Sequence, residues 1–317
     1  MDLTTKSLKG IGWVSFAQII TQIIQFIVSV VLARLLFPKD FGMIAMIVVF
    51  SNFINVFQGL GMGSSIVQKK DLDGDHINSI FWIVTGLGLF LTMLMIGVSP
   101  IIAHFYKQPQ LLKLSMALGM TFFITSLGIV PRSLFGREMQ FKVLSLINII
   151  AVSFAGLLAI FLAFKGFGVW SLIYRQIALV TLGSLLLLII RKWKPTFSFQ
   201  WSKIETMFKF GINLTGASFT NYFKRNLDNL LIGKFLGAQA LGYYNFSYNI
   251  MLYPLGRISG VLSQVFFPAL SKIQENLSRI REVYKKATFF ISVITFPLMI
   301  GLFVLAPEFV RAVFKTK

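Results

Sequence analysis

Two stretches 200 positions apart decide how this chain is organised: LARLLFPKDFG at Leu32–Gly42 and IGKFLGAQALG at Ile232–Gly242. The same offset pairs similar residues within both stretches and before them: Arg34 with Lys234, Leu36 with Leu236, Gly42 with Gly242, Lys9 with Lys209 and Ala17 with Ala217. Further on, SPIIAHFYK at Ser99–Lys107 resembles APEFVRAVFK at Ala306–Lys315 after a small slip. Matches that recur at one period indicate an internal repeat, so we expect two copies of a larger unit.

The composition places the chain in lipid rather than in water. Of its 317 residues, 56% are hydrophobic and only 13% are charged, and the mean hydropathy is +0.77. A soluble domain carries about a quarter charged residues and cannot bury this much apolar surface. The net charge of +19 does not indicate nucleic-acid binding, because the basic residues fall between apolar runs instead of forming one basic face. We therefore expect an all-α polytopic membrane protein with no nucleic-acid partner.

Nothing in the sequence indicates an enzyme, a metal site or a cofactor. The chain has no cysteine, and its two histidines, His76 and His104, lie far apart in polar connections without metal-ligand spacing. Gly59, Gly61 and Gly63 form a GxGxG run, but no strand precedes it, so we do not expect a dinucleotide site. We expect neither catalysis nor a bound cofactor.

Apolar runs long enough to cross a bilayer recur along the whole chain. A spanning helix needs about 20 mostly apolar residues. The predicted spans are 10–35, 41–63, 78–103, 111–131, 143–164, 168–190, 209–234, 241–266 and 287–306. The repeat places the first three spans over the last three, so both copies enter the membrane in the same direction. We predict a six-helix first lobe at 1–195 and the first three helices of a second, parallel lobe at 196–317, and we expect the chain to be truncated relative to a longer architecture.

Basic residues indicate which way the spans run. They concentrate in the N-terminus and in every second connection: Lys6, Lys9, Lys69, Lys70, Arg132, Arg137, Lys142, Arg191, Lys192, Lys194, Lys203, Lys209, Lys272, Arg279, Arg281, Lys285 and Lys286. The alternate connections hold fewer: Arg34, Lys39, Lys107, Lys113, Lys165 and Lys234. The positive-inside rule therefore predicts a cytoplasmic N-terminus.

Several basic residues fall inside predicted spans: Arg175, Lys224, Arg225 and Arg257. A charge at mid-bilayer costs at least about 2.5–3.5 kcal/mol, so such residues usually face a cavity or a partner. Asp228 lies four positions after Lys224 and three after Arg225, on one helix face, and can neutralise one of them. A cation-lined cavity accounts for the surplus positive charge, and snorkelling or structural pairing is the alternative.

Polar residues also form a stripe along the first span. Gln18, Gln22 and Gln25 follow one another at spacings of four and three, which places them on one helical face. Amides in membrane helices commonly hydrogen-bond to neighbouring helices. They equally suit the wall of a polar cavity that receives sugar hydroxyls, and both interpretations stay open.

The chain resembles a known family in three places. RNLDNLLIGKFLGAQALGYYNFSYNIMLYPLGRISGVLSQVFFPALSKIQ at Arg225–Gln274 is similar to the signature region of the polysaccharide-transporter branch of the multidrug/oligosaccharidyl-lipid/polysaccharide flippases. LARLLFPKDFGMIAM at Leu32–Met46 and GLGMGSSIVQKKDL at Gly59–Leu72 are similar to connections of that branch. O-antigen, colanic-acid and teichuronic-acid exporters belong to it, and the resemblance covers essentially the whole chain.

This resemblance implies a MATE-like flippase fold, with two six-helix lobes around a cavity that opens alternately to each side. The implied function is export of an undecaprenyl-diphosphate-linked oligosaccharide to the outer leaflet of a bacterial inner (plasma) membrane, for lipopolysaccharide or exopolysaccharide biosynthesis. The implied partners are this lipid-linked oligosaccharide, membrane lipids, a polysaccharide polymerase and glycosyltransferases.

In such a flippase the intramembrane charges would attract the lipid diphosphate, because arginine suits bidentate phosphate contacts. The predicted substrate-binding cations are Arg175, Lys224, Arg225 and Arg257, with Asp228 as their charge partner or a group in ion coupling. Gln18, Gln22 and Gln25 would line the sugar path.

Two other functions remain open from the sequence. A multidrug cation antiporter of the same fold would need acidic residues in its cavity, whereas among the predicted spans' charges only Asp228 opposes the basic residues. A non-transporting, truncated fragment is the second alternative, because the second lobe ends after three spans.

Overall fold

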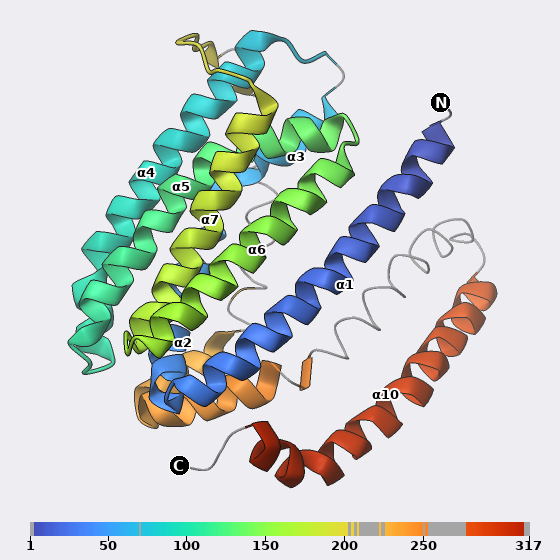
Figure 1. The fold of residues 1–317 in the computed structure, drawn as a ribbon. Coiled ribbons are helices and arrows are strands. Elements are labelled where there is room, and N and C mark those ends of the chain that lie inside the picture. The colour runs from blue at the N-terminus through green and yellow to red at the C-terminus, as the bar shows by residue number, and fades with distance from the viewer. Residues whose placement is uncertain are drawn as a thin grey trace. The chain divides into compact units, whose positions relative to one another are not determined.

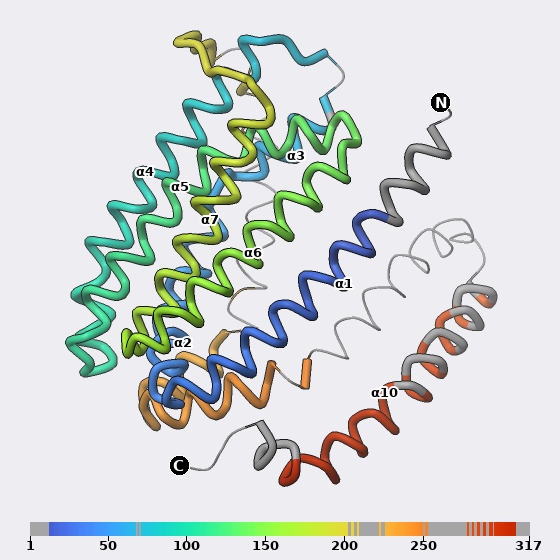
Figure 2. Tube along the Cα trace, in the orientation of Figure 1, coloured from blue at the N-terminus to red at the C-terminus, as the bar shows by residue number. Residues whose placement is uncertain are grey.

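The computed structural model describes residues 3–69, 71–201, 204–205, 208, 222, 226–249, 251–252 and 277–313 (Figure 1, Figure 2). Every regular element in these ranges is a helix, which confirms the predicted all-α membrane fold. The chain divides into two compact units, Met1–Gly242 and Tyr243–Lys317. Each unit is described by itself, and the predicted lobe boundary near residue 195 stays a prediction.

The first unit contains the predicted spans one to six. Its helices are α1 (Leu3–Leu35), α2 (Pro38–Asn55), the 3-10 helix η1 (Gln58–Gly61), α3 (Met62–Gln68), α4 (Gly74–Phe105), α5 (Gln110–Arg137), α6 (Phe141–Phe164) and α7 (Val169–Arg191). Five of them, α1, α4, α5, α6 and α7, are long and apolar enough to cross a membrane. A sixth crossing results if α2 and the following stretch Gln58–Val67, bent by 42°, count as one span.

The later predicted spans fall largely on residues outside the described ranges. Residues 226–235 and 237–249 are helical, but most of the predicted spans 209–234 and 241–266 is not described, so both stay predictions. The second unit contains α10 (Leu277–Val313), which includes the predicted ninth span at 287–306. Its apolar part among the described residues, Thr295–Glu308, is shorter than a full crossing.

The long helices of the first unit lie side by side in the order α4, α5, α7, α6 and α1, and each packs on the next (Figure 1). Helix α2 packs across α5 and α7, and α3 packs on α5. Small residues allow the close approaches: a Cβ on Gly88 of α4 would lie 2.5 Å from the Ser126 Cβ of α5, and a Cβ on Gly156 of α6 would lie 2.6 Å from Val28 of α1. Close packing of this kind holds helices together in lipid, where no hydrophobic force acts between them.

The sharp turn that joins α1 to α2, called the corner below, occurs twice in the chain. Helix α1 ends at Leu35, the Leu36 N–H donates to the Leu32 carbonyl at 2.8 Å, and α2 begins at Pro38. At the same places 200 residues later, helix stops at 235, the Leu236 N–H donates to the Ile232 carbonyl at 2.9 Å, and helix resumes at 237. The backbone therefore repeats where the sequence does.

The second copy of the corner packs on α2 and on the end of α4. The Tyr222 hydroxyl donates to the Val49 carbonyl of α2, and the ring centroids of Tyr222 and Phe53 lie 5.4 Å apart. The Lys234 ammonium donates to the Phe105 carbonyl at 2.6 Å and lies 4.0 Å from the centroid of the Phe105 ring. These contacts join residues more than one hundred positions apart into the first unit.

Candidate functional site

The glutamine face of α1 lies next to the face by which α1 packs on α6. Val28 is buried on the packing face and follows Gln25 by three positions. Ala17, which is also buried, directly precedes Gln18. Gln18 is exposed, and Gln22 and Gln25 are partly exposed. Within the described part of the chain, no hydrogen bond reaches the side-chain amide of any of the three. The structure thus leaves these amides available on one face of a helix whose other residues are mainly apolar.

Two further amides, which sequence reasoning missed, extend from α2. Asn52 and Asn55 are exposed and lie three positions apart, so they share a face near the end of this helix. An exposed amide in a membrane helix is more stable against a polar interior than against lipid tails. The signal was present in the sequence as two asparagines inside the apolar run SNFINVF.

The second span is broken directly after these asparagines. Gly59, Leu60 and Gly61 have positive φ values of 74°, 41° and 65°, a left-handed conformation that no helix interior tolerates. The side chain of Gln58 donates to the Phe122 carbonyl of α5 at 3.0 Å and holds the break against α5. Irregular backbone at membrane depth occurs where protein or a water-filled cavity covers it. The GxGxG run therefore marks a helix break within the predicted span 41–63.

The predicted cation cluster is described only in part. Arg175 lies on α7, two turns from its start, and is partly buried. Asp228 is partly buried on the helical stretch 226–235, and its carboxylate accepts a 2.8 Å hydrogen bond from the Asn229 N–H. Lys224, Arg225 and Arg257 lie outside the described residues. Their role as substrate-binding cations stays a prediction.

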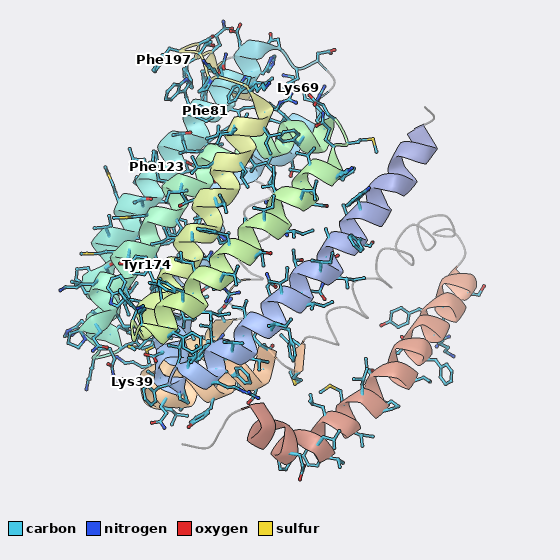
Figure 3. All side chains as sticks on the ribbon, viewed as in Figure 1. Lys39, Lys69, Phe81, Phe123, Tyr174 and Phe197 are labelled. Atoms are coloured by element: carbon cyan, nitrogen blue, oxygen red, sulfur yellow. The ribbon has the colours of Figure 1, made fainter. Side chains whose placement is uncertain are left out.

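Polar contacts gather at the end of the first unit where α4 begins. Lys69 and Phe197 lie at this end, and Lys39 lies at the opposite end (Figure 3). The Asp73 carboxylate caps α4: it accepts from the His76 N–H at 2.9 Å, and the same oxygen lies 2.6 Å from His76 Nδ1. The Lys69 Nζ lies 2.6 Å from His76 Nε2. The buried His76 ring thus bridges Lys69 and Asp73.

The same end carries a second ionic contact, between the turn after α5 and the end of α7. Arg191 donates to both carboxylate oxygens of Glu138, at 2.6 and 2.5 Å. These hydrogen bonds hold the pKa of Glu138 below its usual value of 4.5. The described residues contain no group of three histidine or carboxylate side chains placed to hold a metal ion. We therefore interpret the polar contacts at this end as stabilising the fold. The amides of α1 and α2 remain candidates for binding a ligand.

Comparison with known proteins places the chain among polysaccharide biosynthesis proteins. Residues 31–317 match the family model described as "Polysaccharide biosynthesis protein". Over its whole length the chain is 30% identical to the teichuronic acid biosynthesis protein of Bacillus subtilis, covering 66% of that relative. It is 27% identical over its whole length to a lipopolysaccharide biosynthesis protein of Escherichia coli, covering 65% of it. Over 94% of its length it is 24% identical to the succinoglycan biosynthesis transport protein of Rhizobium meliloti, covering 60% of it.

The chain thus spans 60–66% of the length of these relatives. No solved structure matches it. The family match includes both copies of the repeated corner and the break in the second span. The resemblance drawn from the signature stretches is confirmed, and the chain belongs to the polysaccharide biosynthesis protein family.

Proposed function

We propose that the chain forms part of a flippase that moves a lipid-linked oligosaccharide across the membrane for cell-surface polysaccharide biosynthesis, and that it carries out transport instead of catalysis. The observation that carries this proposal is the pair of amide faces on two spans that follow each other in the sequence, Gln18, Gln22 and Gln25 on α1 and Asn52 and Asn55 on α2. Sugar hydroxyls need many donors and acceptors along their path, and amides supply both.

The amides are costly to expose to lipid, which supports a polar path between spans. Gln18, Asn52 and Asn55 are exposed in the described structure, on helices otherwise dominated by apolar side chains. A polar group without a hydrogen-bond partner in an apolar medium loses several kcal/mol, so lipid tails are an unfavourable neighbour for five amides. A hydrated channel that admits an oligosaccharide removes this cost.

The diphosphate of the cargo would be held by cations. Arg175, Lys224, Arg225 and Arg257 supply positive charge inside the predicted spans, and Asp228 limits it. An inside-negative membrane potential favours outward movement of an anion by about 2.3 kcal/mol per charge per 100 mV. We place the protein in a bacterial inner membrane with a cytoplasmic N-terminus, since basic residues predominate in the connections on that side.

The test is complementation of a flippase-deficient strain with a full-length homologue that carries the equivalent substitutions. We expect Gln22→Leu combined with Asn52→Leu to reduce surface polysaccharide strongly at normal expression, because the double change makes the path apolar. Gln110→Leu is the matched control, since Gln110 is an exposed amide at the first residue of α5, outside the proposed path.

A second comparison addresses the cation. Arg175→Gln is expected to reduce transport, whereas Arg132→Gln, at an exposed arginine near the end of α5, is expected to leave it unchanged. Full surface polysaccharide in the double amide variant and in Arg175→Gln, each at normal expression, would refute the proposed path.

A further inference from the structure

The segment that follows α7 folds back onto the start of α4. Residues 192–200, called the strap below, have no regular secondary structure. The Asn78 side chain of α4 donates to the Thr196 hydroxyl at 2.5 Å and accepts from the Thr196 N–H at 3.2 Å. The Trp82 indole N–H donates to the Thr196 carbonyl at 3.0 Å. Both polar groups of the Thr196 backbone and its hydroxyl are therefore bound by one helix.

The rest of the strap is attached to the same face of α4. The Ser198 hydroxyl donates to the Asp75 carboxylate at 2.6 Å, and the Gln200 side chain donates to its other oxygen at 3.2 Å. The Gln200 N–H donates to the Ser79 hydroxyl at 2.9 Å. Spacings of three or four residues place these partners on one helical face: Asp75, Asn78, Ser79 and Trp82. The strap is thus fixed in place along about two turns of α4.

The aromatic side chains of this segment are exposed. Phe197 is 93% exposed, and Phe199 and the following Trp201 are about half exposed, at 55% and 47%. Lys192 and Lys194 at the start of the strap are exposed as well. The strap therefore presents an aromatic group beside a basic one, and neither is covered by the described part of the chain.

The positive charge of the strap is not neutralised by the described residues. Of the carboxylates nearby, Asp75 accepts hydrogen bonds from the strap itself and Glu138 binds Arg191. Within the described ranges no salt bridge reaches Lys192 or Lys194. The surface formed by the strap is therefore suited to an anion.

The length of α4 places the strap at the edge of the bilayer. Helix α4 has 32 residues. It is about 48 Å long at 1.5 Å per residue, whereas the hydrocarbon core of a bilayer is about 30 Å thick. The surplus lies at its start, since its carboxylate and amide side chains, Asp75 and Asn78, are there. Phe197 lies at this end of the first unit, together with Lys69 (Figure 3). The strap is then at the level of the lipid headgroups.

We propose that the strap, together with Trp201, forms a binding site for an anionic phospholipid. Its aromatic side chains enter the interface between headgroups and acyl chains, which is where aromatic residues of membrane proteins concentrate. Lys192 and Lys194 bind the phosphate, because ammonium groups at a membrane surface attract anionic lipids. The connection between the two predicted lobes is thereby attached to α4 on one side and to lipid on the other.

A fluorescent probe on the strap tests its depth, because the chain has no cysteine of its own. The purified full chain with Phe197→Cys is labelled with a polarity-sensitive fluorophore and reconstituted in vesicles of equal amounts of phosphatidylglycerol and phosphatidylcholine. We expect a blue-shifted emission that lipids brominated on their acyl chains quench. Asp71→Cys is the control, since Asp71 is exposed and precedes the first turn of α4, and its probe should report water. Phe199→Cys provides a second probe position on the strap.

The choice of lipid is tested in the same vesicles. Brominated phosphatidylglycerol should quench the probe on Phe197→Cys at lower amounts than brominated phosphatidylcholine. Replacing Lys192 and Lys194 by glutamine should lower the preference for phosphatidylglycerol by about fivefold for each lysine. Lys107→Gln with Lys113→Gln is the matched control, because these exposed lysines lie beyond the other end of α4 and at the start of α5, and it should leave the preference unchanged.

Two results would overturn the proposal. The first is an emission at both strap positions like that of the Asp71→Cys probe, which would show that the strap faces water. The second is equal quenching by the two brominated lipids, or an unchanged preference in the variant that lacks Lys192 and Lys194. Neither measurement uses a cargo, so both outcomes are independent of whether the protein transports an oligosaccharide.

Discussion

The contact between α4 and α5 at Gly88 allows a prediction of stability. A Cβ at this position would lie 2.5 Å from both Cβ and Oγ of Ser126 and 3.1 Å from the Phe122 carbonyl oxygen. Carbon atoms in favourable contact are about 3.5–4.0 Å apart, so Gly88→Ala must move the two helices apart by about 1 Å. Ser126 cannot turn away easily, because its hydroxyl donates to the Phe123 carbonyl at 2.6 Å.

Overpacking of this kind costs about 1–3 kcal/mol. Gly88→Ala should therefore lower the ratio of folded to unfolded protein about 5- to 150-fold, at tenfold per 1.4 kcal/mol. Gly97→Ala on the same helix is the control, because open space surrounds that position, and it should be neutral or stabilise the protein by about 0.4–1 kcal/mol. Reversible unfolding in mixed dodecylmaltoside and dodecylsulfate micelles measures both.

The double variant Gly88→Ala with Ser126→Gly separates steric overlap from other effects of the methyl group. It removes the Cβ that the new alanine would meet, so we expect it to be more stable than the sum of the two single changes by about 0.5–3 kcal/mol. The reasoning is refuted if Gly88→Ala is as stable as Gly97→Ala, or if the two changes in the double variant are simply additive.

Three further outcomes can be measured by the same unfolding assay. Arg191 keeps the pKa of Glu138 low, so their ion pair stabilises the fold above pH 4.5 and the gain is lost as pH falls through the folded-state pKa. Because Glu138 is 40% exposed, the free energy of unfolding of the native protein should exceed that of Glu138→Gln by no more than about 1 kcal/mol near neutral pH. The two values should converge in acid, and a difference that does not depend on pH would contradict this. Asp73→Ala should lower the free energy of unfolding by about 1 kcal/mol, and Asp73→Asn should lower it much less, because asparagine also caps helices. Equal losses in the two variants would argue against the cap. Tyr222→Phe should cost about 0.5–1.5 kcal/mol through its lost hydrogen bond to Val49, and an unchanged stability would show that this contact contributes nothing.

The sequence predicted the first six spans well, because each is a run of apolar residues near the length that a bilayer requires. It also predicted the corner at Leu32–Gly42, since the same break in the helix recurs at the expected offset. Hydropathy could not predict the break at Gly59–Gly61, because glycine and leucine keep the run apolar while the backbone turns left-handed. The signal lay in Gly59, Gly61 and Gly63, whose spacing resembles a dinucleotide-binding motif but here permits a left-handed turn.

The candidate site was predictable only where residues share one helix. The spacing of Gln18, Gln22 and Gln25 placed them on one face of α1, and the described structure has them there. The hydrogen bonds from Asn78 to Thr196 at 2.5 Å and from Lys234 to Phe105 join residues that no local pattern connects. Such contacts depend on which helices pack together, and the periodicity of a single sequence carries no information about that packing.

The two copies of the corner also face each other: a Cβ on Gly42 would lie 2.5 Å from the carbonyl carbon of Ala238, and a Cβ on Gly242 would lie 3.0 Å from the carbonyl carbon of Pro38. This reciprocal contact bears on how a chain of this kind can arise. A surface that is complementary to a copy of itself serves two identical subunits as well as two halves of one chain. A single six-span protein that carried the corner of Leu32–Gly42 would pair with its own copy through the same glycine, in the same orientation in the membrane. Gene duplication and fusion would then place one copy of each half in every chain, and the sequences of the two halves could diverge. Gly42 and Gly242 are identical in this chain, whereas Pro38 and Ala238 already differ, which is the pattern expected when only the point of closest approach is constrained.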